Sequence, residues 1–339
     1  MPKDVIFDKQ NILIVGGAGF VGSHLAEELV TANKVICIDN FLTGDEGNIS
    51  HLYQNPNFEF INHNIIETIE LEQQPELSSF KVDFQGIQEI YFLGSPTSPN
   101  TYRQHPIETM LANSIGLSNA LDLAVKYKAK FLYASSPAVY GDAQSEDLVK
   151  EDYVGAVDQL ASRSAYVEAK RFGEALVSNY RQIHNLDAKI IRIFNCYGPK
   201  MKLDDGRMIP EMIRDALLKK DITIFGDKDS AGCYFYISDL IKAMIKMMES
   251  VEVGPINIGS DWQTKFSEVA EKVISITGTK SKIKYKKPDS FMAPQLTPDI
   301  SLAKEKLDWF PIVLLNEGLH QTIDYLSAQK DVLRPGKNK

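Results

Sequence analysis

The sequence predicts an α/β fold, in which a doubly wound parallel sheet is followed by a smaller C-terminal domain. Three observations support this fold. Short apolar runs alternate with segments of helical periodicity through the first 195 residues, and such runs are typical of strands buried on both faces. A glycine-rich turn lies between the first run and the first helical segment. After residue 196 the alternation loosens, and loops rich in Gly, Pro and Asp become frequent.

The individual elements follow from the same patterns. The apolar runs predict strands at residues 11–15, 35–38, 58–61, 89–93, 130–134 and 189–194. A helical pattern runs through Leu25, Leu29 and Val30, and further helices are predicted at about 107–127, 164–184, 208–220, 238–250, 266–277 and 301–307. Strands that alternate with helices form parallel sheets through right-handed crossovers, so we expect a doubly wound sheet.

The composition limits the classes of function. The net charge of −8 argues against a nucleic-acid partner, and no apolar run is long enough to cross a membrane. The start of the chain lacks the apolar core of a secretory signal. Cys37, Cys196 and Cys233 are far apart and odd in number, which is typical of reduced thiols in a cytoplasmic protein. No metal site is expected, because the histidines and cysteines lack metal-ligand spacing.

The glycine turn indicates a dinucleotide site. Gly16, Gly19 and Gly22 follow the first strand and open a helix at Phe20 and Val21. Glycines let the backbone approach a pyrophosphate, and the helix N-terminus offers free N–H groups to it. The alternative is a turn that only packs the helix on the strand. The next predicted strand, however, ends at an acidic residue, as it does in the dinucleotide-binding Rossmann fold.

That acidic residue also indicates which dinucleotide is bound. Asp39 is expected to accept hydrogen bonds from the adenosine ribose hydroxyls, with Asn40 beside it. Residues 40–46 contain no Arg or Lys, so a 2′-phosphate would meet carboxylates there. The sequence therefore favours NAD over NADP. We divide the chain into an NAD-binding Rossmann domain (1–195), a substrate-binding domain partly interleaved with the sheet (196–330) and a polar tail (331–339).

The residues that carry the chemistry are expected on the helix predicted at 164–184. Tyr166 and Lys170 are four residues apart, so both lie on one face of that helix. A lysine ammonium beside a phenol favours the phenolate, and we therefore expect the pKa of Tyr166 to be lowered. Such a tyrosine can take a proton from an alcohol while hydride leaves the same carbon. The alternative is an exposed helix pair without a catalytic role.

Taken together, these motifs resemble the extended short-chain dehydrogenases/reductases that modify nucleotide sugars, and most of all the UDP-glucuronate decarboxylases. The likeness covers about residues 10–325. It is carried by the segments 16–25, 35–41, 57–61, 95–99, 139–142, 163–170, 194–201, 204–207, 236–240 and 298–300.

The resemblance implies roles for several residues. Ser136 would hold the reacting oxygen of the sugar, Tyr166 would act as acid and base, and Lys170 would contact the nicotinamide ribose. The alternative for Ser136 is a serine at a strand end that bonds only to backbone. Asn195 matches the family's diphosphate-binding asparagine. Further substrate-binding candidates are Pro96 and Ser98 in a matching segment, and Lys200 and Arg207 as cations near the expected diphosphate.

The chain departs from the decarboxylase pattern at the substrate site. Ala138 stands where that family has a glutamate, and Pro137 replaces a serine. Gly232 and Leu296, the latter within Gln295-Leu296-Thr297, lie where the family has two arginines. Charge-assisted bonds to phosphate contribute on the order of 1.5–3 kcal/mol each, so their loss matters. One alternative is neutral drift, with compensation by another cation from the set Lys200, Lys202, Arg207, Lys228, Lys286 and Lys287. We favour the other alternative and expect a changed substrate or reaction outcome.

Three functions remain open from the sequence. Decarboxylation of a nucleotide-linked hexuronate through a 4-keto intermediate is placed narrowly first. A nucleotide-sugar 4-epimerase is second, because such enzymes need only the Ser, Tyr and Lys set. The third is a protein that binds NAD and a ligand without turnover, which the changes at Ala138, Gly232 and Leu296 would explain.

The resemblance also implies a homodimer, since the family pairs two long helices of each subunit. The matching segments are about 103–127 and 160–184. Apolar residues recur there at helical spacing, namely Ile107, Leu111, Ile115, Phe172, Leu176 and Tyr180. The same stripe is also compatible with packing against the sheet alone.

Overall fold

The computed structural model describes residues 8–141, 148–204, 206–287 and 295–328. Its centre is a seven-stranded sheet in the order β11-β6-β5-β4-β1-β2-β3, and every pairing in it is parallel. The strands are β1 (Asn11–Val15), β2 (Lys34–Asp39), β3 (Phe58–Asn62), β4 (Glu89–Phe92), β5 (Lys130–Ser135), β6 (Ala188–Ile193) and β11 (Ile256–Ile258). The predicted doubly wound Rossmann sheet is confirmed.

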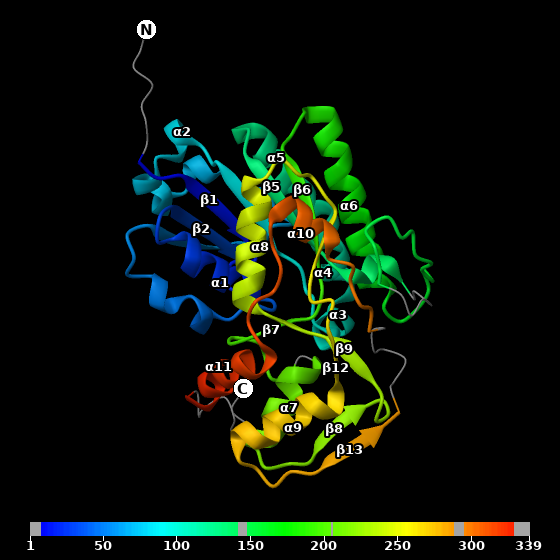
Figure 1. Ribbon diagram of the computed structural model, residues 1–339. Coiled ribbons are helices and arrows are strands. Elements are labelled where there is room, and N and C mark those ends of the chain that lie inside the picture. Colours follow the sequence, from blue (N-terminus) through cyan, green and yellow to red (C-terminus); the bar gives the residue numbers. More distant parts are fainter. Residues whose placement is uncertain (1–7, 142–147, 205, 288–294, 329–339) are drawn as a thin grey trace.

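Helices cover both faces of this sheet (Figure 1). The helices that pack on its strands are α1 (Phe20–Leu29), α5 (Leu117–Tyr127), α6 (Ser164–His184) and α8 (Ile237–Glu249). Three shorter helices are α2 (Val82–Gln85), α3 (Pro99–Gln104) and α4 (Pro106–Leu111), of which α4 packs on α6. Alternate residues of each strand face opposite sides. Ile12 and Ile14 of β1 join the core beneath α1 and α8, whereas Leu13 and Val15 join the core beneath α5 and α6.

The C-terminal part of the chain builds a smaller lobe below the sheet (Figure 1). Its helices are α7 (Met208–Leu217), α9 (Phe266–Thr277) and α11 (Leu315–Ala328), and α10 (Ser301–Leu307) packs against β11. Its short strands form three pairs: β8 (Ile222–Phe225) with β13 (Ile283–Lys286), β9 (Ala231–Cys233) with β12 (Gln263–Lys265), and β7 (Cys196–Tyr197) with β10 (Phe235–Tyr236).

The two parts of the chain interleave. Strand β11 and helix α8 come from beyond residue 196, yet β11 pairs with β6 at the sheet edge and α8 packs on β5 and β6. The short strand Ile256–Ile258 was not expected from the sequence, because its apolar run is brief and is flanked by Gly254 and Gly259. The predicted tail 331–339 lies outside the described residues.

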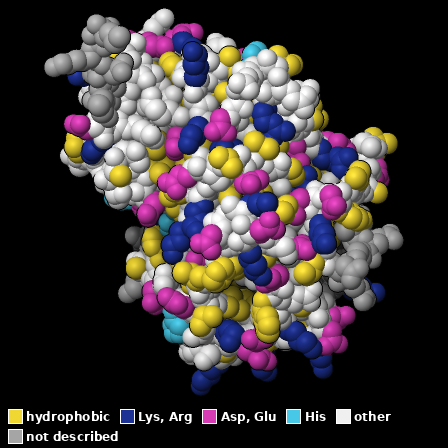
Figure 2. Space-filling model, turned by 45° about the horizontal axis from the view of Figure 1, so that its top comes forward, with side chains coloured by type: hydrophobic (Ala, Val, Ile, Leu, Met, Phe, Trp, Pro, Cys, Tyr) yellow, Lys and Arg dark blue, Asp and Glu magenta, His cyan; other side chains and the backbone are white. Residues whose placement is uncertain are grey.

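The surface carries charged side chains of both signs. Figure 2 shows Lys and Arg interspersed with Asp and Glu over one face, and hydrophobic side chains gathered in its lower half. On this face the net charge of −8 is therefore not concentrated in one region. Among the described residues, no helix has the length and apolar character needed to cross a membrane.

Candidate active site

A cavity of about 690 Å³ lies between the carboxyl ends of the sheet strands and the smaller lobe. Its wall includes the glycine turn and Asp39 as well as Ser136, Tyr166 and Lys170. Ligands of doubly wound sheets bind at this edge, and the volume is typical of a small-molecule site. The structure therefore places the predicted cofactor and catalytic residues around one cavity.

The glycine turn is tight enough to require its glycines. Gly16 has a φ of +85°, and its N–H donates to the carbonyl oxygen of Ile38 over 2.8 Å. A Cβ at Gly16 would lie 2.7 Å from the backbone of Leu93. A Cβ at Gly22 would overlap the carbonyl oxygen of Gly16. The turn thus holds β1 and α1 close together, with the start of α1 at Phe20 facing the cavity.

Asp39 ends β2 inside the cavity, as predicted. Its carboxylate accepts hydrogen bonds from the N–H of Ala18 (3.1 Å) and of Phe41 (2.8 Å). Burial raises the pKa of Asp39, while these two N–H groups act against that increase. The carboxylate is therefore held in a fixed position at the adenosine end of the expected dinucleotide site.

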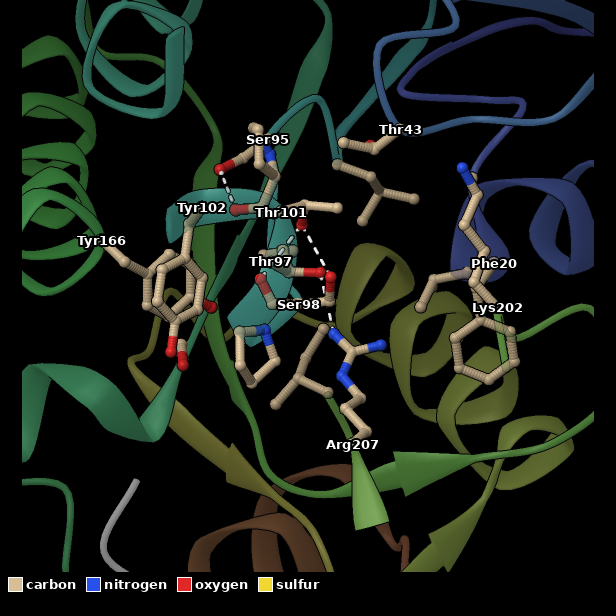
Figure 3. Close-up of a pocket in the computed structure, with 18 of the residues that line it drawn as sticks. Phe20, Thr43, Ser95, Thr97, Ser98, Thr101, Tyr102, Tyr166, Lys202 and Arg207 are labelled. Carbon is tan, nitrogen blue, oxygen red and sulfur yellow. Dashed lines mark hydrogen bonds between the residues drawn. The ribbon is translucent and has the colours of Figure 1, made fainter. Parts of the chain in front are cut away.

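One cation acts on Asp39 that the sequence analysis did not place beside it. The charge of Lys202 lowers the pKa of Asp39, so the two side chains interact although they are far apart in the sequence. Lys202 also lies on the cavity wall, near Phe20 in Figure 3. The sequence-based expectation covered residues 40–46, which contain no Arg or Lys, and Lys202 lies beyond them.

We predict that the protein binds NAD⁺ more tightly than NADP⁺, and that Asp39→Ala weakens binding of NAD⁺. Removing a charge-assisted hydrogen-bond acceptor costs about 1.5–3 kcal/mol, or roughly 10- to 100-fold in affinity. Calorimetry with both dinucleotides measures this. Lys202→Ala serves as a second variant, which should lower the affinity for NADP⁺ more than that for NAD⁺. Equal affinities of the wild type for the two dinucleotides would contradict the assignment.

Ser136 and Tyr166 come together from different elements. Ser136 directly follows β5, and its Oγ accepts a hydrogen bond from the N–H of Ala138 over 3.2 Å. Tyr166 lies in the first turn of α6 and hydrogen-bonds with the Ser136 side chain. Both residues are buried against the cavity wall. Ser136 thus bonds to backbone at Ala138, as the alternative without a catalytic role expects, and it also contacts Tyr166, the predicted proton carrier.

The pKa of Tyr166 differs from the sequence-based expectation. Burial raises the pKa of Tyr166, and the opposing contributions come from Ser136, Arg207 and Arg163. Lys170 is not among the main contributions to this shift, and its Nζ donates to the carbonyl oxygen of Ala134 over 2.8 Å. The expectation that Lys170 lowers the pKa of Tyr166 is therefore wrong for this structure.

Lys170 itself has a strongly altered pKa. Only 2% of the residue is exposed, and burial lowers the pKa of Lys170 from 10.5 to about 7, while the charge of Glu174 acts in the opposite direction. The ammonium also lies 4.9 Å from the centre of the Tyr133 ring. The charge of Lys170 is therefore costly inside the fold, and a pKa altered in this way is typical of a functional site.

This burial predicts a pH-dependent stability. Between about pH 7 and pH 10.5 the unfolded chain binds a proton at Lys170 that the folded chain has lost, so stability rises with pH there. Below about pH 7 the cost of the buried charge is fully present. We expect Lys170→Met to raise the melting temperature of the cofactor-free protein at pH 6.5, and to raise it less near pH 10. Thermal denaturation at both pH values measures this, and a pH-independent difference would contradict it.

The segment from Ser95 to Tyr102 forms the cavity wall beside Tyr166 of α6 (Figure 3). The ring of Tyr102 stacks on the ring of Tyr166, with centroids 4.8 Å apart and planes 9° apart. Arg207 Nη2 donates to Thr97 Oγ1 over 2.9 Å, and the Oγ of Ser98 lies 2.7 Å from Thr101 Oγ1. The predicted substrate-binding residues Pro96, Ser98 and Arg207 all face this cavity.

The two other predicted substrate-binding residues have partners within the fold. Asn195 Nδ2 donates to the carbonyl oxygen of Cys233 and to Gln295 Oε1, each over 3.2 Å. Lys200 Nζ lies 2.6 Å from Glu27 Oε1 and donates to the carbonyl oxygen of Asn48. Both residues border the cavity. The ammonium of Lys200 is nevertheless engaged in an ion pair, so its role in substrate binding stays a prediction.

The positions that depart from the decarboxylase pattern lie close to the site. Ala138 is on the cavity wall and directly adjoins Ser136 through its N–H. A Cβ at Gly232 would lie 2.9 Å from Gln295 Oε1 and 2.9 Å from the ring of Phe266. The side chains of Gln295 and Phe266 therefore occupy the space into which an arginine at 232 would extend.

Sequence reasoning assigned no role to one further cation in the wall. Arg163 precedes α6 and faces the cavity, and its charge lowers the pKa of Tyr166. Its Nε is buried and has no hydrogen-bond partner within the described part of the chain. The sequence did contain one indication of a role for Arg163: it lies three residues before Tyr166, in the segment 163–170 that resembles the family.

Comparison with known proteins agrees with this geometry. The NAD dependent epimerase/dehydratase family matches residues 12–259. UDP-glucuronic acid decarboxylase 1 of Arabidopsis thaliana is 38% identical over 324 residues, which are 95% of this chain and 71% of that protein. UDP-glucuronic acid decarboxylase 1 of Danio rerio is 36% identical over 95% of this chain and 74% of its own length.

Solved structures show the same fold. UDP-glucuronic acid 4-epimerase from Bacillus cereus, in complex with UDP-glucuronic acid and NAD, has a TM-score of 0.80 and 28% identity, covering 94% of this chain and 99% of that one. UDP-glucose 4-epimerase from Thermotoga maritima has a TM-score of 0.82 and 26% identity, covering 95% and 100%. The glycine turn, Asp39 and the Ser136–Tyr166 pair fit an NAD site, and the chain belongs to the NAD-dependent epimerase/dehydratase family of nucleotide-sugar enzymes.

Proposed function

We propose that the protein converts a nucleotide-linked hexuronate to a pentose by NAD-dependent oxidation at C4 followed by loss of CO₂. The observation that carries this proposal is the meeting of Ser136, Tyr166 and Lys170 at a cavity that also contains the dinucleotide turn and Asp39. The relatives named UDP-glucuronic acid decarboxylase support the same reaction class.

The chain's own residues supply binding and proton transfer. Ser136 would hold the C4 oxygen, and Tyr166 would take its proton as the C–H bond at C4 breaks. Bound NAD⁺ supplies the hydride acceptor. The C5–carboxylate bond can then break, because its electron pair moves toward the C4 ketone. After protonation at C5, Tyr166 would return its proton to the C4 oxygen as the ketone is reduced, so the net change is one carboxylate lost as CO₂ and replaced by one hydrogen.

The charge around Tyr166 favours an anionic substrate. Arg163 and Arg207 both lie close enough to lower the pKa of Tyr166 electrostatically, and both face the cavity. Guanidinium groups pair well with carboxylates and phosphates. A hexuronate linked to a nucleoside diphosphate carries both kinds of group.

Mass spectrometry of a substrate panel tests the proposal. The purified protein is incubated with NAD⁺ and each of UDP-glucuronate, UDP-galacturonate, UDP-glucose and UDP-galactose, with Tyr166→Phe as the matched control. We expect at least one uronate to lose CO₂, and no neutral hexose to change. Turnover of a neutral hexose alone, or of none of the four, would contradict the proposal.

A 4-epimerase is the second candidate. It is favoured by Ala138, because epimerisation needs no carboxylate group at that position of the wall. A solved UDP-glucuronic acid 4-epimerase of the same fold is also similar to this chain. A product of unchanged mass that separates from its substrate by chromatography would identify this activity. Binding of NAD⁺ without any turnover would instead favour the third reading, a binding protein.

We propose that the protein is a homodimer through α4, α5 and α6, which lie side by side in Figure 1. Four large apolar side chains are exposed on α4, α6 and the π-helical turn between α4 and α5: Ile107 (62%), Met110 (45%), Ile115 (49%) and Phe172 (50%). Three other residues of the predicted stripe, Leu111, Leu176 and Tyr180, are half-buried. Packing against the sheet therefore accounts for only part of the stripe.

Light scattering at micromolar concentration is expected to give the mass of two chains. Ile107→Glu with Phe172→Glu should give one chain, because two charges would then be buried at the contact. Phe84→Glu is a control, since Phe84 is 83% exposed and lies on α2. A monomeric wild type would contradict the proposal.

The domain division and the compartment also remain proposals. The interleaving of β11 and α8 with the sheet supports a substrate domain at 196–330 that is not separate from the domain at 1–195. Cys37, Cys196 and Cys233 are free thiols, which is compatible with the cytoplasm.

A further inference from the structure

Helix α6 carries a third polar residue on the face that carries Tyr166 and Lys170. Glu174 follows Lys170 by four residues, so the three side chains form one stripe along the helix. Only 14% of the Glu174 side chain is exposed. Glu174 does not border the main cavity, and nothing in the proposed chemistry so far uses it.

The carboxylate of Glu174 joins α6 to two strands. Ser135 Oγ donates to Glu174 Oε1 over 2.5 Å. Arg192, on β6, donates from Nε to Oε1 over 2.9 Å and from Nη2 to Oε2 over 2.7 Å. Ser135 and Arg192 are both buried. Short charge-assisted bonds of this kind fix geometry, because both carboxylate oxygens have partners.

The strand end that Glu174 holds is the one that carries Ser136. Helix α6 holds β5 at two consecutive residues, since Lys170 Nζ donates to the carbonyl oxygen of Ala134 and Glu174 accepts from Ser135. Ser136 is the next residue. These two bonds therefore hold the end of β5, and Ser136 after it, against the helix that carries Tyr166.

We propose that Glu174 is a positioning residue of the reaction: through Ser135 its carboxylate fixes the strand end that carries Ser136 against the helix that carries Tyr166. The proposal rests on the redox function proposed above. Misplacing a catalytic group by about 1 Å can cost about 10²-fold in rate, so such a bond affects turnover without touching the substrate.

Glu174 has a second effect through charge. The ring of Tyr133 on β5 lies 4.9 Å from the Lys170 ammonium, and Tyr166 and Glu174 lie four residues before and after Lys170 on α6. Arg192 is bonded to Glu174. The charge of Glu174 raises the pKa of Lys170 against the larger effect of burial. Removing the charge of Glu174 should therefore lower the pKa of Lys170 further, and the ammonium should lose its proton at a lower pH. We expect the loss of activity at alkaline pH to begin at a correspondingly lower pH.

Two variants separate positioning from the ion pair with Arg192. Ser135→Ala removes the bond to the strand and leaves the Glu174–Arg192 pair, whereas Glu174→Gln keeps an oxygen acceptor for Ser135 and removes the charge. Glu168→Gln, on the same helix, is the control. With the uronate that the wild type converts, we expect kcat to fall about 10- to 100-fold in Ser135→Ala while KM changes little. We expect the alkaline limb of the pH–rate profile to move to lower pH in Glu174→Gln.

Wild-type kcat in Ser135→Ala, or an unmoved alkaline limb in Glu174→Gln, would overturn the proposal and leave Glu174 as the partner of Arg192 alone. If the wild type converts no substrate, the proposed function fails separately, and hydrogen exchange of the NAD⁺-bound protein tests the positioning. The amides of residues 134–136 and 138 should then exchange faster in Ser135→Ala than in Glu168→Gln. Equal exchange would overturn the proposal.

Discussion

Replacing Tyr166 with phenylalanine is expected to lower turnover by about 10²–10⁴-fold, because the phenol is the group that takes and returns the proton. The ring would remain stacked on Tyr102, so the cavity wall should keep its shape. Binding of NAD⁺ should therefore stay near that of the wild type. Steady-state kinetics with a converted uronate and calorimetry with NAD⁺ measure the two quantities.

The matched control is Tyr285→Phe, since Tyr285 lies on β13 and does not border the cavity. It should behave as the wild type in both measurements. Retained turnover in Tyr166→Phe would show that another group carries the proton. Lost binding of NAD⁺ would show that the hydroxyl of Tyr166 acts mainly on the cofactor.

The second large effect is expected at Ala138. The wild type should convert UDP-glucuronate well below about 1 per second, a rate typical of enzymes, because the wall lacks the glutamate of the decarboxylases at this position. Ala138→Glu is expected to raise UDP-xylose formation by about 10-fold, which corresponds to regaining roughly one charge-assisted hydrogen bond. The rate of product formation, followed by mass spectrometry, measures this.

Ala138→Gln is the matched control, since it has a similar size without the charge. We also combine Ala138→Glu with Gly232→Arg, and expect a further gain only if Gln295 moves aside, because its Oε1 lies 2.9 Å from a Cβ at 232. Wild-type turnover of UDP-glucuronate at about 1 per second or faster would show that these departures have no effect. No gain in either variant would point to a different substrate.

Local patterns made much of this site predictable. The glycine turn depends on residues within seven positions of each other, and the face shared by Tyr166 and Lys170 depends on one helical repeat. The spacing of apolar residues that predicts each strand and helix also depends only on residues close together in the sequence. The structure confirms the predicted strands and long helices.

The electrostatics of the site could not be predicted in this way. The pKa of Tyr166 is set by burial in the folded wall, where Tyr102 from α3 stacks on it. The charge of Lys202 acts on Asp39, and Lys200 forms an ion pair with Glu27, only after the two parts of the chain have folded together. These contacts join residues more than 150 positions apart, so no local pattern indicates them.

The most direct test of the central claim follows the hydrogen at C4. UDP-glucuronate and UDP-galacturonate, each carrying deuterium at C4, are incubated with the protein and NAD⁺, and the product is analysed by mass spectrometry and NMR. A 4-keto intermediate with internal hydride transfer predicts a product that has lost CO₂ and still carries deuterium at C4. A product with ordinary hydrogen at C4, or no conversion of either uronate, would contradict the account.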